Sequence, residues 1–584
     1  MLLVYGPRSL DYDFGASHPL TPRRFGPGID LLRAVGAEPG LAPEPASDEE
    51  LRWLHTRPYL DVVKRFSVDP YGFSQAGIGD GGDCPPFADM HEASAAVAGG
   101  SIRAIEAILR GDVDHAQHPG GGLHHAMPAR ASGFCIYNDV ALAIARARRD
   151  GLRVMYIDLD VHHGDGVQAM HWDDPGVLTV SIHETGRALF PGTGEADEVG
   201  EGAAAGTSVN VPLLPGTGER AWVAVLESLL PELAATFGPD VIVSQHGADS
   251  HAWDPLAHLA LTTTAHGEVA RLVDTLAHRF ADGRWLATGG GGYDAYRVVP
   301  RTWALTWLAG AHREVPSSTP GAWRDRWADE AARYGQAPLP ETFEDLPNAG
   351  LAFDAAQAAV EDQAYALAAT IRRVVVPRLL IEAIDRGWWD PLRPASGEMP
   401  VVVDPVRGTP TILPSVDAAT WSRLSLARGV VAPADPSAAH ELIAAGLGAP
   451  HSAPVAAGPH PATVTDAPHP ATVTAAVLGS TVVGLAVSAP ADQRDGRAGL
   501  LALGVAPAFR RHGVAGALLG AHVAPGTITE VTLAERDVLE PLDRTVRGSI
   551  ARDLLTRAGF DVEVADASVR AIDPGAIVAR LDSA

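Results

Sequence analysis

Residues 1–310 alternate between two patterns of apolar and polar positions. In one pattern, apolar residues recur every three or four positions, as in Glu92–Arg110 and Asn138–Arg149, which predicts amphipathic helices. In the other, short continuous apolar runs indicate strands that are buried on both faces. These runs are Arg153–Asp160, Val177–Ile182, Asp240–Ser244 and Arg284–Thr288. Strands of this kind separated by helices predict an α/β fold with a mostly parallel sheet and helices on both of its faces.

Each predicted strand leads into a polar or glycine-rich segment at its carboxyl end. These segments concentrate histidine, aspartate and glycine, and they are residues 158–165, 181–184, 245–249 and 289–293. In sheets of this kind, ligands bind outside the carboxyl ends of the strands. We therefore expect the four segments to meet at one site.

The pattern changes after Gly310. Trp323–Tyr334 and Phe353–Ile384 are predicted helices, whereas Val473–Ser488 predicts a β-hairpin whose strands are separated by a turn at Gly479-Ser480-Thr481. Before the hairpin, a nine-residue unit rich in Pro, Ala and Thr occurs twice, which predicts an extended spacer whose His460 and His469 are solvated. The predicted organisation is a first domain over 1–385, a connection over 386–430, and a smaller α+β domain over 431–584 that includes the spacer at 449–472.

Composition narrows the function classes. Of the 584 residues, 46% are hydrophobic and 20% are charged, which excludes a collagen, a coiled coil and a wholly disordered chain. The net charge is −26 and no arginine-rich stretch stands out, so we expect no nucleic-acid partner. Two cysteines exclude a disulfide scaffold. The absence of a signal-peptide core and of a long apolar run predicts a cytoplasmic protein without a membrane partner.

Three residues of these segments predict a metal site. Asp160 and His162 alternate along the end of one strand and therefore share a face, and Asp249 follows another strand. One imidazole and two carboxylates bind a metal while leaving positions open for water and substrate, as a catalytic site requires. Zinc and ferrous iron would use the same ligands.

Proton-transfer groups lie nearby in the sequence. His124 and His125 are adjacent on a glycine-rich segment, and Asp158 and Asp165 remain to orient two imidazoles. Tyr293 follows four glycines and supplies a phenol that can donate to a carbonyl oxygen. A metal, two His–Asp pairs and a tyrosine together predict hydrolysis of an amide.

These residues resemble the zinc-dependent histone-deacetylase superfamily, and in particular its bacterial acetoin-utilisation (AcuC-type) branch. The matching motifs span the first 310 or so residues in the family's order. They are DCP (83–85), GGLHHAMP (121–128), ASGFCIYND (131–139), YIDLDVHHGDGVQ (156–168), TVSIHE (179–184), LFPGTG (189–194), QHGADSH (245–251) and GGGGYD (289–294).

The resemblance implies specific roles. His124 would pair with Asp158, His125 would pair with Asp165 and shuttle the proton, and Tyr293 would bind the substrate carbonyl. The acyl-lysine channel would be lined by Gly133, Phe134 and Phe190, with Asp83 at its rim. A structural monovalent cation, usually potassium, would bind the carbonyls of Asp158, Asp160 and His162 together with Ser181 and Ile182. Cys135 is read as a small buried residue, and Cys84 as the same or as a thiol at the rim.

Arginases resemble this fold but hold two manganese ions, which need further carboxylates. The corresponding positions here are Gly164 and His251. A mononuclear amidohydrolase is therefore favoured.

The C-terminal domain contains a second recognisable loop. After a predicted strand ending at Val505, the segment PAFRRHGVAGALL opens a helix, and free backbone N–H groups at such a start suit a pyrophosphate. The stretch resembles the acetyl-CoA loop of GCN5-related N-acetyltransferases. The residues implicated are Val505, Arg510, Arg511, His512, Gly513, Val514 and Ala515. Leu554 and Leu555 stand where the family often has a tyrosine acid, so transfer, sensing and a structural role all stay open.

The leading hypothesis is therefore a metal-dependent deacetylase of acetyl-lysine in proteins. Resemblance to AcuC-type enzymes suggests an acyl-CoA synthetase as the acetylated partner. An acetylpolyamine or another small amide is the alternative substrate, and a non-catalytic acyl-lysine or acyl-CoA sensor is the alternative from another class. The sequence indicates neither the acyl-chain length nor the oligomeric state.

Overall fold

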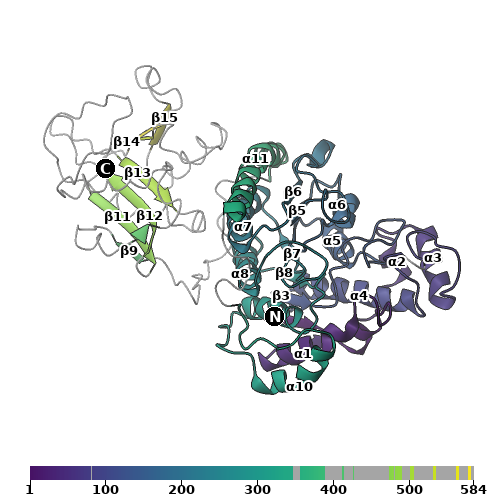
Figure 1. Ribbon diagram of the computed structural model, residues 1–584. Coiled ribbons are helices and arrows are strands. Elements are labelled where there is room, and N and C mark those ends of the chain that lie inside the picture. Colours follow the sequence, from purple (N-terminus) through teal and green to yellow (C-terminus); the bar gives the residue numbers. More distant parts are fainter. Residues whose placement is uncertain are drawn as a thin grey trace, which may run out of the picture. The chain divides into compact units, whose positions relative to one another are not determined.

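A computed structural model describes residues 1–79, 82–345 and 355–388, together with eight strands between Thr411 and Arg580. For those strands and for residues 355–357, only the backbone is described. The chain divides into two compact units. One consists of Met1–Asp390 with Pro394–Met399, and the other of Pro391–Arg393 with Pro400–Ala584 (Figure 1).

The first unit contains one eight-stranded sheet in which every pair of neighbours is parallel. Its order is β2-β1-β3-β8-β7-β4-β5-β6. The strands are β1 (Leu2–Val4), β2 (Pro39–Leu41), β3 (His115–His118), β4 (Val154–Asp158), β5 (Val177–Glu184), β6 (Ser208–Leu213), β7 (Val241–Gln245) and β8 (Trp285–Thr288). The predicted α/β class with a parallel sheet is confirmed.

Helices cover both faces of the sheet, as the apolar runs predict (Figure 1). On one face α4 (Met90–Leu109) and α5 (Asp139–Arg149) contact the central strands, and on the other α8 (Thr263–Phe280) and α9 (Val299–Gly310) do so. Asn138 caps α5, as predicted, by accepting a hydrogen bond from the Ala141 N–H. The other helices are α1 (Phe25–Ala34), α2 (Asp48–Leu51), α3 (Arg57–Val68), α6 (Asp165–Met170), α7 (Glu219–Phe237), α10 (Gly321–Arg333) and α11 (Ala355–Asp385).

The sequence pattern missed some strands and misjudged one segment. The pattern does not predict the short strands β1, β2, β3 and β6. β1 is apolar but only three residues long, and β2, β3 and β6 have polar or mixed side chains, so all four carry little periodic signal. β3 reads His-Ala-Gln-His, yet all four of its residues are buried between helices. Residues 181–184 were expected to form a loop, but they continue β5, whose eight residues are all buried.

Within its described residues, the second unit contains two small sheets, for which the backbone alone is described. The predicted hairpin is confirmed as β11 (Thr472–Leu478) paired antiparallel with β12 (Thr481–Ser488), and the predicted strand after it as β13 (Leu500–Val505). β9 (Thr411–Leu413) and β10 (Ser425–Leu426) complete that sheet. β14 (Glu530–Leu533), β16 (Ile577–Arg580) and β15 (Asp561–Val564) form the other. The predicted helix opened by PAFRRHGVAGALL, at 507–519, lies outside the described residues.

Candidate active site

The histidines and aspartates predicted to meet are brought together at the carboxyl edge of the sheet. They follow β3, β8, β7 and β4, which are four consecutive neighbours. His124 and His125 come after β3, Tyr293 after β8, Asp249 after β7, and Asp160 with His162 after β4. β4 ends at Asp158 rather than at Asp160, so the segment that carries the ligands is irregular backbone.

Asp160, His162 and Asp249 form one buried group. His162 Nδ1 lies 3.0 Å from Asp160 Oδ1 and 3.2 Å from Asp249 Oδ2. All three ligand atoms lie within 4.8 Å of one another. Burial and the charge of Asp160 raise the pKa of Asp249 to about 6, which shows how costly two adjacent buried carboxylates are without a compensating cation. The three residues therefore fit a divalent metal.

The second oxygen of each carboxylate is held by the surrounding backbone and side chains. Asp160 Oδ2 accepts hydrogen bonds from Gln245 Nε2 at 2.7 Å and from the Gly291 N–H at 2.8 Å. Asp249 Oδ1 accepts one from the Val161 N–H at 3.0 Å. These bonds orient Asp160 Oδ1 and Asp249 Oδ2 toward His162. Three protein ligands leave part of a metal's coordination sphere open, as in catalytic sites.

Two histidine–aspartate pairs lie beside this group. His124 Nδ1 is 2.8 Å from Asp158 Oδ2, and His125 Nδ1 is 2.7 Å from Asp165 Oδ1. Tyr156 donates a further hydrogen bond to Asp158 Oδ2 at 2.7 Å. In both pairs the Nδ1 atom is engaged, so the Nε2 atom is the one left for chemistry.

The two imidazoles differ in basicity. Burial and the neighbouring His124 lower the pKa of His125 to about 4, so His125 is neutral at pH 7. Burial also lowers the pKa of His124, but the charges of Asp158 and Asp160 outweigh it and raise the value to about 9. A cation held by Asp160 would offset part of that charge.

Tyr293 lines the same cavity, an open pocket of about 280 Å³ that His124, His125, Asp160 and His162 also line. Its ring contacts Phe134 edge to face, with centroids 5.9 Å apart. Burial, together with the charges of Asp249 and Asp160, raises its pKa well above the usual value, so the phenol keeps its proton and can donate it in a hydrogen bond.

The predicted channel residues lie at the mouth of this cavity. Gly133 has φ +52°, and a Cβ there would lie 2.4 Å from His125 Cδ2 and 2.9 Å from Phe190 Cε1, so only glycine fits. Phe190 packs edge to face on His125 with centroids 5.0 Å apart, and it is 42% exposed. Asp83 is exposed and accepts a hydrogen bond from the Gly133 N–H at 2.8 Å.

Comparison with known proteins agrees with this geometry. Residues 18–309 match the family model of the histone deacetylase domain. The acetoin utilization protein AcuC of Bacillus subtilis (strain 168) is 44% identical over 333 residues, which cover 56% of this chain and 86% of that protein. The chain belongs to the histone deacetylase family. Two further relatives place this deacetylase with the AcuC-type members. AcuC of Staphylococcus xylosus is 36% identical over 349 residues, and AcuC of Staphylococcus aureus (strain COL) is 37% identical over 358 residues, each match covering 59% of this chain and 90% of the relative.

The deacetylase also carries a GNAT domain. Residues 448–524 match the acetyltransferase (GNAT) family model, as the resemblance predicts. Of the predicted acetyl-CoA residues, Val505 ends β13, whereas Arg510–Ala515 lie outside the described residues. Among the helices that the structure describes, none combines the length and apolar character needed to cross a membrane.

Three residues that position the deacetylase site were not predicted. Gln245 holds Asp160, and Asp254 Oδ2 accepts the Tyr293 N–H at 2.8 Å. Arg24 is buried and donates to the Gly290 carbonyl at 2.7 Å, within the glycine segment that carries Tyr293. Gln245 is the first residue of the quoted motif QHGADSH and Asp254 lies three residues after its end, so the motif marks the region but not the partners of these two residues. Arg24 is separated from its partner by 266 positions and gave no local signal.

The remaining predicted positions divide into three groups. Ser181 pairs in register with Asp158, which puts Ser181 and Ile182 beside the proposed monovalent-cation carbonyls, but that ion stays a prediction. His251 points to Asp345, with Nε2 2.9 Å from Oδ2, and so has its own partner. Cys84 is fully buried, so the interpretation of this residue as a rim thiol was wrong, whereas Cys135 is buried as predicted.

Proposed function

We propose that this chain hydrolyses the amide of acetyl-lysine in proteins and that its catalytic metal is zinc. The observation that supports the proposal best is the convergence of three metal-ligating atoms, two His–Asp pairs and Tyr293 on one cavity. Zinc, when bound by Asp160, His162 and Asp249, would polarise the substrate carbonyl and make a water molecule more acidic.

The histidines and Tyr293 have different roles in proton transfer and in hydrogen bonding to the substrate. His125 Nε2 takes a proton from the attacking water, because its Nδ1 is held by Asp165 and its low pKa keeps it neutral. The water oxygen bonds to the carbonyl carbon while Tyr293 donates a hydrogen bond to the carbonyl oxygen. The C–N bond then breaks, and a histidine returns the proton to the lysine nitrogen. The products are acetate and free lysine.

The substrate is proposed to be a protein rather than a small amide. The rim residues Asp83 and Phe190 are exposed and can meet an extended peptide. The relatives are named for acetoin utilisation, a metabolic process, and we propose an acetylated acyl-CoA synthetase as partner. Lys64 is the only lysine in the chain, so the enzyme offers one residue of its own as a substrate.

Hydrolysis of an acetyl-lysine peptide, measured before and after chelation, tests the reaction. We expect chelation to abolish activity and zinc to restore it more fully than ferrous iron. Activity that survives chelation or His125→Ala would overturn the mechanism. An acetylpolyamine hydrolysed faster than the peptide would overturn the substrate class but leave the mechanism intact.

For the GNAT domain we propose binding of acetyl-CoA at 505–515, tested by calorimetric titration of the full chain with acetyl-CoA. Arg510→Ala is expected to weaken binding, and no heat from the wild-type protein would overturn the proposal. Potassium at the carbonyls near Ser181 is proposed as a structural ion. We also place the enzyme in the cytoplasm, where two unpaired cysteines are typical.

A further inference from the structure

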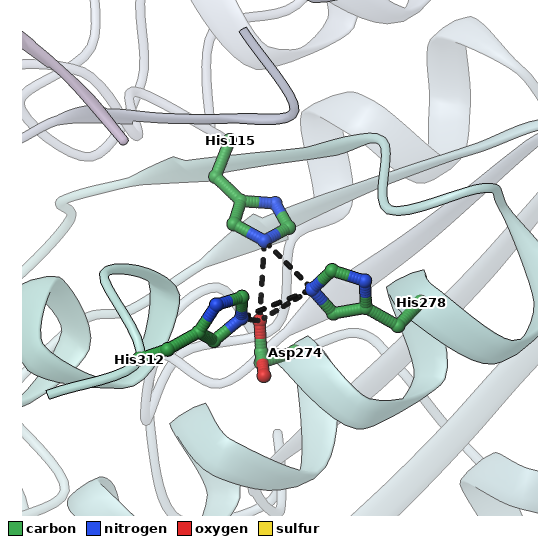
Figure 2. A group of neighbouring side chains, drawn as sticks. All are labelled: His115, Asp274, His278 and His312. Carbon is green, nitrogen blue, oxygen red and sulfur yellow. Dashed lines mark hydrogen bonds and ion pairs between the residues drawn. The ribbon is translucent and has the colours of Figure 1, made fainter. Parts of the chain in front are cut away.

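A second group of side chains that could bind a metal lies at the opposite ends of the strands from the candidate active site. It consists of His115, Asp274, His278 and His312, whose side chains converge in Figure 2. His115 is the first residue of β3, and it stands in register with Trp285, the first residue of β8. The group is therefore at the amino ends of the strands, whereas the candidate active site is at their carboxyl ends.

The four side chains come from three separate elements. Asp274 and His278 are four residues apart in the last turns of α8, which places them on one face of that helix. His312 lies two residues beyond the end of α9. It has φ +52°, a position after a helix that usually holds glycine, and the histidine is nevertheless accommodated there with its ring turned toward the group (Figure 2).

The spacing of the ligand atoms matches a tetrahedral metal. His278 Nε2 lies 3.0 Å from the Nε2 atoms of both His115 and His312. Asp274 Oδ1 lies 3.3, 3.1 and 3.5 Å from the Nε2 atoms of His115, His312 and His278. Zinc–ligand bonds of about 2.0–2.1 Å at tetrahedral angles require ligand atoms about 3.3–3.4 Å apart. Five of the six pairs therefore already lie close to this separation.

Hydrogen bonds alone do not satisfy such a group. Each contact between two Nε2 atoms needs one proton shared by two nitrogens, and a third nitrogen and a carboxylate oxygen crowd the same point. Three Nε2 atoms carry at most three protons, yet five contacts are shorter than 3.6 Å. A cation accepts all four lone pairs at once.

Burial and charge also favour a cation. The side chains of His115, Asp274 and His278 are 3%, 15% and 20% exposed, and that of His312 is 55% exposed, so an ion can enter from one side. Asp274 brings a carboxylate into this largely buried group, and its negative charge calls for a compensating cation. Gly283, with φ +78°, lies against the His278 ring, and its missing side chain leaves the ring room.

We propose that His115, Asp274, His278 and His312 bind a second zinc ion, which is structural and fastens the ends of α8 and α9 to β3. Three imidazoles and a carboxylate suit zinc, and four protein ligands close its coordination sphere, as in structural rather than catalytic sites. This site is independent of the proposed reaction, because none of its residues reaches the active-site cavity.

Zinc stoichiometry tests the proposal. The full chain, without an affinity tag, is stripped with chelator, equilibrated with excess zinc, freed of unbound ion and analysed by mass spectrometry of the metal. We expect two zinc ions per wild-type chain and one in His278→Ala. His312→Gly should also bind one, and it protects against a folding artefact because glycine suits the left-handed backbone there. Asp249→Ala should retain the second ion, and Asp249→Ala/His278→Ala should bind none.

One control variant decides between sources of the ion. Replacing the spacer histidines by His460→Ala/His469→Ala should leave two ions, and a loss there would assign the extra ion to the spacer and overturn the proposal. One zinc in the wild type that disappears in Asp249→Ala would also overturn it, as would two ions in both His278→Ala and His312→Gly. Zinc should raise the Tm of Asp249→Ala but not that of Asp249→Ala/His278→Ala, whatever the activity of either.

Discussion

The two histidine–aspartate groups lie at opposite ends of the strands of one parallel sheet, which are called its carboxyl edge and its amino edge. They differ in how many ligands the protein supplies to a metal. At the carboxyl edge, three ligand atoms face a cavity. The other oxygen of each ligating carboxylate accepts hydrogen bonds from Gln245, Gly291 and Val161. At the amino edge, four ligand atoms converge, which is enough to close the coordination sphere of a tetrahedral metal. The loops that follow strands thus supply an open site suited to chemistry, and the helix ends that precede and follow β8 supply a closed one suited to holding the fold together.

The same helices are also fastened at their other ends. Asp345 Oδ2 accepts hydrogen bonds from the Thr263 N–H at the start of α8 and from His251, and its Oδ1 accepts one from Arg301 of α9. His251 stands two residues after Asp249. An ion pair therefore secures α8 and α9 at the edge that carries the reaction, and the proposed zinc secures them at the opposite edge.

The largest expected effect is a loss of catalytic activity, and it should follow substitution of a ligand at the carboxyl edge but not at the amino edge. Asp249→Ala removes a ligand of the open site and should lower kcat/KM for an acetyl-lysine peptide by about 10³-fold or more, because metal and base act together there. Asp274→Ala removes the equivalent carboxylate from the closed site, and we expect kcat/KM to stay within about threefold at 25 °C. Equal losses in the two variants would show that the edges are not functionally distinct.

Next in size is the loss of the ion pair at the carboxyl edge. Asp345→Asn leaves Arg301, whose side chain is fully buried, without a counter-charge, and should lower the free energy of unfolding by roughly 3–5 kcal/mol. Unfolding in urea followed by tryptophan fluorescence measures this. Asp325→Asn, on an exposed position of α10, is the control and should change little.

The pH dependence of that loss has a defined sign. Burial raises the pKa of Asp345, but the hydrogen bond from His251 and the charge of Arg301 outweigh it and hold the pKa well below its usual range. A carboxylate whose pKa is lower in the folded state stabilises the fold above its unfolded pKa of about 4, and the contribution disappears as the pH falls further. The difference between wild type and Asp345→Asn should therefore be constant from pH 7 to about 5 and shrink below 4. A difference that grows on acidification would contradict this.

Tyr293→Phe should have a smaller effect than losing a ligand. It removes the hydrogen bond to the carbonyl oxygen and should lower kcat by about 10²–10³-fold while zinc stoichiometry stays unchanged. Tyr71→Phe, which removes a phenol hydroxyl from an exposed position that does not line the cavity, serves as the control and should retain most of kcat. A matching loss of zinc in Tyr293→Phe would mean that the phenol supports the metal site instead.

The sequence predicted the open edge much better than the closed one, for a physical reason. Asp160, His162 and Asp249 follow apolar strands that periodicity reveals, and parallel strands bring their carboxyl ends together. His115 begins a polar strand that carries no such signal, and His312 follows a helix nearly 200 positions later. Only Asp274 and His278 have a helical spacing, which by itself is an ordinary pair on a helix face.

The roles of the residues that position the ligands could not be predicted from the sequence pattern either, although the hydrogen bonds they make are simple. Gln245 is the last residue of β7, where an amide reads as an ordinary strand end. Its role depends on β7 being the neighbour of β4, which puts its Nε2 2.7 Å from Asp160 Oδ2. Strand order follows from long-range packing, and a single chain's local pattern does not encode it.

The smallest expected effect comes from removing a single hydrogen bond, and it tests whether the two metal sites are independent. Gln245→Leu keeps the side-chain size but removes the donor to Asp160 Oδ2, so this oxygen loses one of its two hydrogen bonds. Loss of a partner of this kind costs about 10–100-fold in metal affinity. Zinc titration against a competing chelator should show that loss for the open site alone, with the affinity of the closed site unchanged. If both affinities fall together, the two edges are coupled through β7 and β8, and the closed site would then act on the reaction as well as on the fold.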